Sequence, residues 1–197
     1  MMNAISSIVA RAIRTACGHI CWQVEWHPTL NLSFQLGPPK MEIGGESCSA
    51  ELKGPKGGSL RKRRVSVCGR WFIWVYHAYW AIQAIDTVVA STSSPDWLKD
   101  VGARFLTGQR LLSIEVCPRT GRTVFAFDLD ASLVVRRITR DSEDELWCLH
   151  EPTGYVLSVR GDGTFDHEPG SGPDGRPRIV RRPLPMTGPG EPHPNSP

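Results

Sequence analysis

The sequence has few of the features that would point to an enzyme. Its 197 residues contain no nucleophile elbow of the form GxSxG, no HExxH zinc motif, no phosphate-binding P-loop and no dinucleotide fingerprint. None of the six cysteines form CxxC pairs, and the chain is longer and poorer in cysteine than a secreted disulfide scaffold. These absences favour free thiols in a reducing cytoplasm, a chain without a cofactor, and a non-enzymatic role over an enzymatic one.

Long apolar runs and a strong charge of one sign are missing as well. The apolar stretch near the N-terminus is interrupted by Arg11 and Arg14, so it lacks the unbroken core of a signal peptide. No run approaches the roughly 20 apolar residues of a membrane span. The net charge of +3 is weaker than the clustered excess of nucleic-acid-binding domains, although RKRR at 61–64 is locally basic. We expect a cytoplasmic protein without membrane contact, and nucleic acid is a disfavoured partner.

The residues that are present predict a globular domain that begins with a helix. Seven tryptophans and a hydrophobic content of 40% supply ample material for a core. Apolar residues from Ile5 to Ala16 recur at helical spacing, and a second helix is predicted at about 95–106. A glycine that can end the helix follows each of them, Gly18 in the first case and Gly108 in the second.

After each of these glycines the chain repeats one pattern. GHICWQVEWHP from Gly18 and GQRLLSIEVCP from Gly108 both start on Gly, have Glu at the eighth position and end on Pro. The alternation of apolar and polar residues between these points predicts a β-strand in each case. The predicted inward residues are Ile20, Trp22, Val24 and Trp26 in the first strand, and Leu112, Ile114 and Val116 in the second.

Further matches extend the repeat and predict the fold class. Phe34 aligns with Phe127, and WFI at 71–73 aligns with WCL at 147–149. We predict an α+β fold, mainly antiparallel β, built from two internally duplicated helix-plus-β-meander units packed pseudo-symmetrically. An antiparallel meander with similar turn residues is the alternative to duplication. The predicted parts are a first unit at 1–92 with a Gly-rich insertion, interpreted as a mobile loop, at 44–62, a second unit at 93–167, and a disordered Pro- and Gly-rich tail at 168–197.

The aromatic run RWFIWVYHAYW at 70–80 is the best candidate for a binding surface. A strand that is apolar on both faces is either buried on both or presents one face to a partner. Core packing under the N-terminal helix is the competing interpretation. The candidate binding residues in this run are Trp71, Phe72, Trp74, Tyr76 and Trp80.

Two weaker candidate sites come from charged and metal-ligating side chains. Glu25 and Glu115 occupy matched positions, so two first strands lying side by side would bring their carboxylates together. Ion pairs with arginines are the favoured alternative. Cys17, His19 and Cys21 would share a strand face, but ligands on a straight strand diverge by about 7 Å per step. We therefore predict no metal and keep these three residues as weak candidates.

One part of the chain resembles a known class of domain. LTGQRLLSIEVCPRTGRTVFAFDLDASLVV, followed by DELWCLHEPTGYVLSVRGDG, is similar to small uncharacterised bacterial domains that share a GQ start, an F-x-F-D-L hairpin and a W-x-L strand. Such domains are regarded as immunity-protein-like, that is, as cytoplasmic partners that bind and silence a toxin. The resemblance covers about 18–163, departs from the pattern at Asp130, where a glycine is expected, and brings no catalytic residues.

The resemblance implies a non-enzymatic interaction protein with a protein partner. The alternative is an enzyme or a small-ligand-binding protein with a site between the two units, built on Glu25, Glu115 or the cysteine and histidine face. The sequence leaves the identity of the partner and the oligomeric state open.

Overall fold

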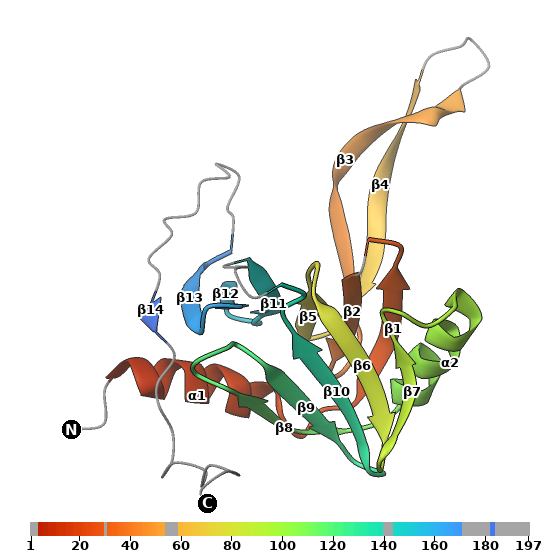
Figure 1. Cartoon of the computed structure of the whole chain (residues 1–197). Helices are drawn as coiled ribbons and strands as arrows, with labels where there is room; N and C mark the ends of the chain where they lie inside the picture. The colour runs from red at the N-terminus through yellow and green to blue at the C-terminus, as the bar shows by residue number, and fades with distance from the viewer. Residues whose placement is uncertain (1–3, 30, 54–58, 140–143, 171–181, 184–197) are drawn as a thin grey trace, which may run out of the picture.

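Two antiparallel sheets, two helices and one long β-hairpin make up the described chain (Figure 1). The computed structural model describes residues 4–29, 31–53, 59–139, 144–170 and 182–183. These elements confirm an α+β fold that is mainly antiparallel β. Neither helix in these ranges is long and apolar enough to cross a membrane.

The elements follow one another in a simple order along the chain. The helices are α1 (Ala4–Ala16) and α2 (Asp96–Leu106). The strands are β1 (Cys21–His27), β2 (Asn31–Leu36), β3 (Lys40–Lys53), β4 (Ser59–Cys68), β5 (Trp71–Val75), β6 (Tyr79–Ala84), β7 (Thr87–Ser91), β8 (Leu111–Val116), β9 (Thr123–Phe127), β10 (Ala131–Arg136), β11 (Glu145–His150), β12 (Tyr155–Arg160), β13 (Thr164–Pro169) and β14 (Arg182–Pro183).

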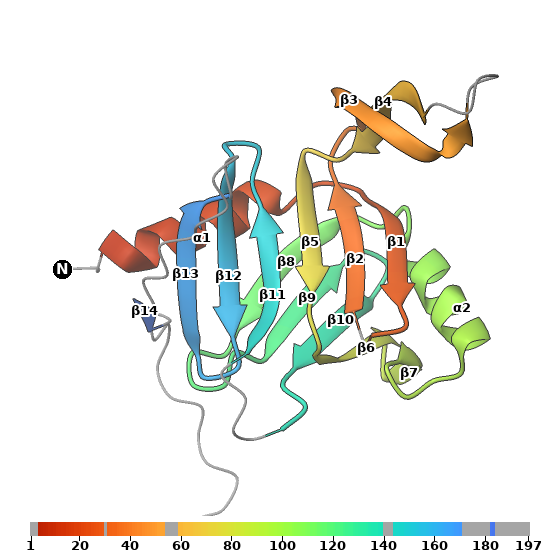
Figure 2. The same ribbon diagram turned by 90° about the horizontal axis from the view of Figure 1, so that it is seen from above.

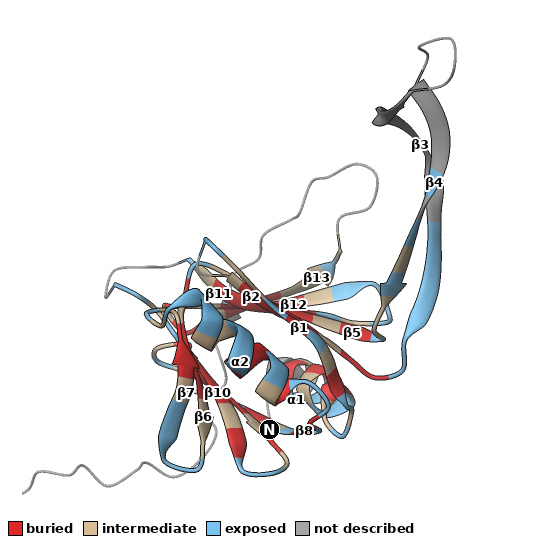
Figure 3. Cartoon of the chain, turned by 90° about the vertical axis from the view of Figure 1, so that its right-hand side faces the viewer, coloured by how far each residue is buried: buried red, intermediate tan, exposed pale blue. Residues whose placement is uncertain are grey.

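The two sheets stack with the core between them (Figure 2). The larger sheet has the order β1-β2-β5-β11-β12-β13-β14, and the smaller sheet has the order β7-β6-β10-β9-β8. Phe34 of β2 meets the edge of Phe125 of β9, with 6.0 Å between the ring centroids. Figure 3 shows the buried residues concentrated where the two layers face each other. The outer face of the larger sheet is consequently left for contacts other than the core.

Each sheet draws strands from both halves of the chain. In the larger sheet β5 pairs with β11, and in the smaller sheet β10 pairs with β6. Helix α1 contacts β8, whereas α2 contacts β1 and β7. The Gly18 amide donates to the carbonyl of Leu111, and the Gly108 amide donates to the carbonyl of Cys21, each at 2.7 Å. Neither predicted unit therefore forms a sheet of its own.

Strand β5 buries every second residue, whereas the two first strands depart from strict alternation. Cys21 is fully buried on β1, whereas Ile20 is 38% exposed. Leu111 is fully buried on β8, whereas Leu112 is 53% exposed. The pairing register shifts inside both strands, and Gln23 at the β1 shift has a φ of 50°. A bulge of this kind spaces the inward residues by three instead of two. The prediction is confirmed at Val24 and Ile114, which are buried, and was wrong at Ile20 and Leu112.

Strands β3 and β4 form a separate two-stranded hairpin, called the arm below, that projects from the larger sheet (Figure 1). The loop predicted at 44–62 was wrong for the described residues, because β3 and β4 pair from Lys40–Cys68 to Lys53–Ser59. Main-chain hydrogen bonds hold such a ladder, so a sequence rich in glycine and serine does not prevent it. At the base of the arm, a Cβ on Gly69 would lie 2.9 Å from the carbonyl oxygen of Leu36, which restricts that position to glycine.

The tail predicted to be disordered overlaps the last strands. Strand β13 runs to Pro169, and Arg182–Pro183 form β14 beside it. The prediction was wrong at these residues. The other tail residues beyond 170 lie outside the described residues.

Candidate functional site

Neither helix covers the outer face of the larger sheet (Figure 2). Three aromatic side chains form a row on this face. Phe72 and Trp74 lie on the face of β5 that points away from the core, and Tyr76 follows directly after the strand. All three side chains are half-buried. Trp74 stacks on Tyr76 with 5.3 Å between ring centroids, and Phe72 meets Trp74 edge-on at 5.7 Å. These three members of the predicted aromatic surface are therefore brought together.

The other two predicted binding aromatics belong to the core. Trp71 is 4% exposed and Trp80 is 1% exposed. Trp71 points inward from β5 because it alternates with Phe72, and Trp80 lies on β6 of the smaller sheet. The prediction that both contribute to a binding surface was wrong, because side chains sealed from solvent cannot contact a partner.

A cysteine lies between two polar rings next to this aromatic row. The Sγ of Cys148 is 3.3 Å from Nε2 of His150 and 3.9 Å from the hydroxyl oxygen of Tyr76. Burial, together with the negative charge of Glu145, raises the pKa of Cys148 to about 12. Desolvation lowers the pKa of His150 and raises the pKa of Tyr76. Cys148 is thus a neutral thiol beside a neutral imidazole, and it lacks the thiolate character of a catalytic cysteine.

Alkylation rates test this assignment. Desolvation opposes ionisation of Cys117, but hydrogen bonds from Thr120 and Arg119 and the charge of Arg119 lower its pKa overall. At mildly alkaline pH we expect iodoacetamide to modify Cys117 faster than Cys148 by roughly tenfold or more, because only the thiolate reacts. Peptide mapping by mass spectrometry over a time course measures both rates in the folded protein. Equal rates would show that Cys148 is activated.

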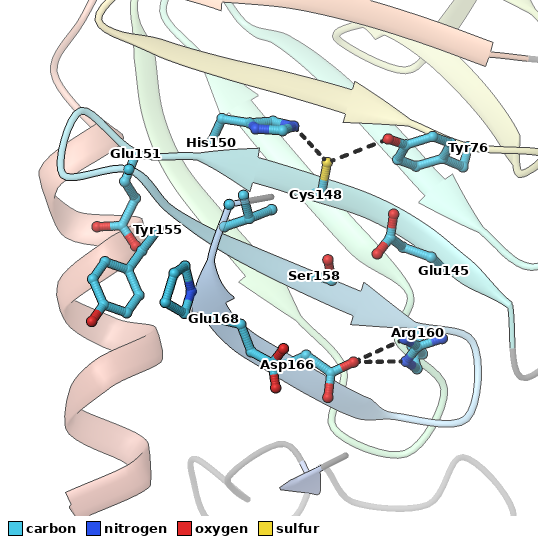
Figure 4. Close-up of a pocket in the computed structure, with 14 residues that line it drawn as sticks. Tyr76, Glu145, Cys148, His150, Glu151, Tyr155, Ser158, Arg160, Asp166 and Glu168 are labelled. Carbon is cyan, nitrogen blue, oxygen red and sulfur yellow. Dashed lines mark hydrogen bonds and ion pairs between the residues drawn. The ribbon is translucent and has the colours of Figure 1, made fainter. Parts of the chain in front are cut away.

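A cavity of about 750 Å³ opens over the outer face beside Cys148 (Figure 4). Strand register places Ser158 next to Cys148 and Asp166 next to Ser158. The parallel row on the same face runs from His150 through Val156 to Glu168. The polar and aromatic residues that line the cavity are Tyr76, Glu145, Cys148, His150, Glu151, Tyr155, Ser158, Arg160, Asp166 and Glu168.

Two buried polar pairs border this cavity. Arg160 donates from Nε at 3.1 Å and from a terminal nitrogen at 2.8 Å to Oδ2 of Asp166. His167 lies 2.6 Å from a carboxylate oxygen of Glu151, and both side chains are 8% exposed. The ring of Tyr155 stacks on His167 at 5.1 Å. Sequence reasoning missed both pairs. The Asp162-Gly163 turn is a hairpin signal that could have placed Arg160 near Asp166, six residues further on, whereas no local pattern marks the neighbour of Glu151.

The remaining predicted site residues do not converge. Glu25 lies on β1 of the larger sheet and Glu115 on β8 of the smaller sheet, and both are exposed. Cys21 points into the core, where burial raises the pKa of its thiol. His19 instead packs against the ring of Trp71 at 4.2 Å. Cys17 is half-buried, and among the described residues no cluster of three metal-ligating side chains occurs.

The arm carries a second surface that sequence reasoning did not single out. Met41 pairs with Val67 and Ile43 pairs with Val65, so the four side chains share one face of the hairpin. They are between 50% and 66% exposed, and Figure 3 shows the arm extending away from both sheets. The alternation of these aliphatic residues with polar neighbours was the signal that could have identified the face. This set is called the aliphatic patch below.

The base of the arm is tied to the larger sheet by side chains. The indole nitrogen of Trp22 donates to the carbonyl of Gly37 at 2.7 Å, and the Gly69 amide donates to Oε1 of Gln35 at 2.8 Å. The aliphatic patch is therefore presented on an anchored element.

In comparisons with known proteins, no family model, no curated protein and no solved structure matches this chain.

Proposed function

We propose that this protein is a non-enzymatic interaction protein that binds a partner protein through the arm. The observation that carries the proposal is the aliphatic patch of Met41, Ile43, Val65 and Val67, which is exposed on a projecting hairpin. A two-stranded hairpin in water is marginally stable, and aliphatic side chains that remain half exposed on one face bury little apolar surface. Contact with a partner would bury this face and stabilise the arm.

The charge of the arm defines the chemistry of the partner. Residues 40–68 contain seven lysines and arginines but three glutamates. The partner therefore presents an apolar surface bordered by carboxylates, which would steer the basic arm toward it. An inhibitor of this kind fits the resemblance to immunity-protein-like domains in the cytoplasm. The high pKa of Cys148 supports a role without nucleophilic catalysis.

We also propose that the chain arose by internal duplication. The two reciprocal hydrogen bonds between Gly18 and Leu111 and between Gly108 and Cys21 support this origin, since each pair of equivalent residues is 90 positions apart. The shared bulge on β1 and β8 supports it as well. In the order of the sheets, β5 lies next to β2 and β10 lies next to β9, so we take β5 and β10 as equivalent strands. The arm, which lies between β2 and β5 in the sequence, is then an addition that only the first unit carries.

Removing the aliphatic patch tests the proposed function. In the variant Met41→Thr/Ile43→Thr/Val65→Thr/Val67→Thr, threonine keeps the β-propensity of the arm while removing most of the apolar surface. We expect affinity for the partner to fall at least tenfold, since buried apolar anchors dominate such interfaces. The partner is recovered with the tagged full chain, identified by mass spectrometry, purified, and titrated against both proteins.

The matched control is Val88→Thr/Leu112→Thr, which removes two aliphatic residues of similar exposure, 51% and 53%, from the smaller sheet. This control should bind like the wild type. Equal affinity of the arm variant and the wild type would refute the role of the arm. Self-association of the wild type that the arm variant loses would instead assign the patch to a second copy and refute the proposed partner.

A further inference from the structure

We propose that a second cavity, where β9 begins and β10 ends in the smaller sheet, binds the dianionic phosphate group of a phosphomonoester. Its volume is about 300 Å³. None of its described lining residues belongs to the arm, so this proposal and the proposed function can fail independently of each other. Those lining residues are Thr120, Arg122, Arg136, Arg137, Ile138 and Thr139.

The strand register sets two arginines against each other at this cavity. Thr123 of β9 pairs with Val135 of the neighbouring strand β10 (Figure 1). One residue further along the same ladder, Arg122 stands opposite Arg136. Thr123 and Val135 are fully buried in the core, so the two arginines point to the other, outer face of the sheet. Side chains directly opposite one another start about 5 Å apart, so both guanidinium groups can reach one ligand.

The charges of these two arginines are not compensated. Among the described residues, no carboxylate forms an ion pair with Arg122 or Arg136. The guanidinium of Arg136 lies over the ring of Tyr79 at 4.0 Å. This contact uses the flat face of the guanidinium and leaves its in-plane N–H groups available to a ligand. Like charges directly opposite each other destabilise a sheet, so a dianion held between the two arginines would replace a repulsion by two attractions.

The rest of the cavity fits a phosphate ester better than other anions. A phosphomonoester presents three acceptor oxygens and up to two negative charges, which match two guanidinium groups better than the two oxygens and one charge of a carboxylate. Ile138 is 52% exposed beside the arginines and offers an apolar contact to the organic part of the ester. Arg137 donates to the carbonyl of Gly161 at 3.4 Å, so we count only its positive charge. A nucleic-acid strand would require basic residues along an extended groove, whereas this pair is confined to one cavity.

Ligands that differ only in their acidic group test the proposal. A blocked Gly-phosphoserine-Gly peptide and its glutamate counterpart are titrated by calorimetry into the full chain at constant ionic strength and about pH 8, where the phosphate is a dianion. We expect the phosphopeptide to bind at least tenfold more tightly than the glutamate peptide. Inorganic phosphate is titrated as the free form of the same group. Tighter binding of the phosphopeptide than of inorganic phosphate would identify a phosphorylated protein as the source of the group, and the reverse would identify a free small molecule.

Single variants locate the binding at this cavity. Arg122→Gln and Arg136→Gln should each weaken binding of the tighter phosphate ligand at least tenfold, whereas Arg104→Gln, which removes an exposed arginine of α2, should not. Arg122 and Arg136 are exposed, so both variants should fold like the wild type, and the ligand should raise the melting temperature of the wild type but not of either variant. Equal binding of the phosphoserine and glutamate peptides, no binding of any phosphate, tighter binding of a single-stranded RNA oligonucleotide, or unchanged binding by both variants would overturn the proposal.

Discussion

Replacing Trp147 with alanine is expected to lower the free energy of unfolding by about 3–5 kcal/mol. Trp147 is fully buried on β11, and its ring meets the edge of Phe125 of β9 at 5.2 Å. Its indole nitrogen also donates to the Thr123 hydroxyl at 2.7 Å, which links the two sheets. The substitution therefore removes packing and leaves a cavity and an unpaired hydroxyl acceptor at the centre of the fold.

Urea denaturation of the wild type and the variant measures this loss. The matched control is Trp97→Ala, because Trp97 on α2 is 66% exposed and its replacement should change stability by about 0.5 kcal/mol or less. Thr123→Val should cost about 1–3 kcal/mol, since it leaves the indole N–H buried without an acceptor. Similar losses for Trp147→Ala and Trp97→Ala would contradict the stacking of the two sheets.

The second large effect is expected at Arg160. The substitution Arg160→Met keeps most of the side-chain volume but leaves the Asp166 carboxylate buried without its partner, and this should cost about 3 kcal/mol at neutral pH. The side chains of Arg160 and Asp166 are 15% and 10% exposed, so solvent can compensate only in part. Thermal and urea unfolding both report the change in stability.

A double variant separates the two possible causes of that loss. In Arg160→Met/Asp166→Leu no charge remains to be buried, so most of the stability should return. If the double variant is as unstable as Arg160→Met alone, the loss comes from packing around the Arg160 stem rather than from the unpaired carboxylate. That result would contradict the electrostatic account of the pair.

Local patterns predicted those parts of the fold that depend on local physics. The alternation in WFIWV places Ile73 and Trp74 on opposite faces, because successive side chains of a strand face opposite ways. It does not say which face is buried, and the structure buries Ile73 and turns Trp74 outward. On β1 the same rule was right at Val24 and wrong at Ile20, because a bulge at Gln23 brings Cys21 to the inward face. The sequence does not indicate a positive φ at this position, because the residue is glutamine and not glycine or asparagine.

The candidate sites depend on contacts between residues far apart in the sequence. Tyr76 and Cys148 meet because β5 pairs with β11, 72 residues further along the chain. No periodicity within either segment specifies that neighbour, so the cavity was not predictable from the sequence. The arm was misinterpreted for a different reason. Its glycines, serines and lysines are typical of loops, whereas its ladder is held by main-chain hydrogen bonds.

Photo-cross-linking inside the cell tests most directly whether the arm contacts a partner protein. A photoreactive amino acid replaces Val65 of the aliphatic patch in one version of the full chain. In the control version it replaces Val88, which has similar exposure on the smaller sheet. Adducts are resolved by mass and identified by mass spectrometry.

We predict that the probe at position 65 yields one dominant adduct with a single protein, and that the probe at position 88 does not. In a separate binding measurement, the same protein should bind the purified wild type but not the arm variant. No adduct at position 65, or the same adducts from both positions, would contradict the claim that the arm is the binding surface.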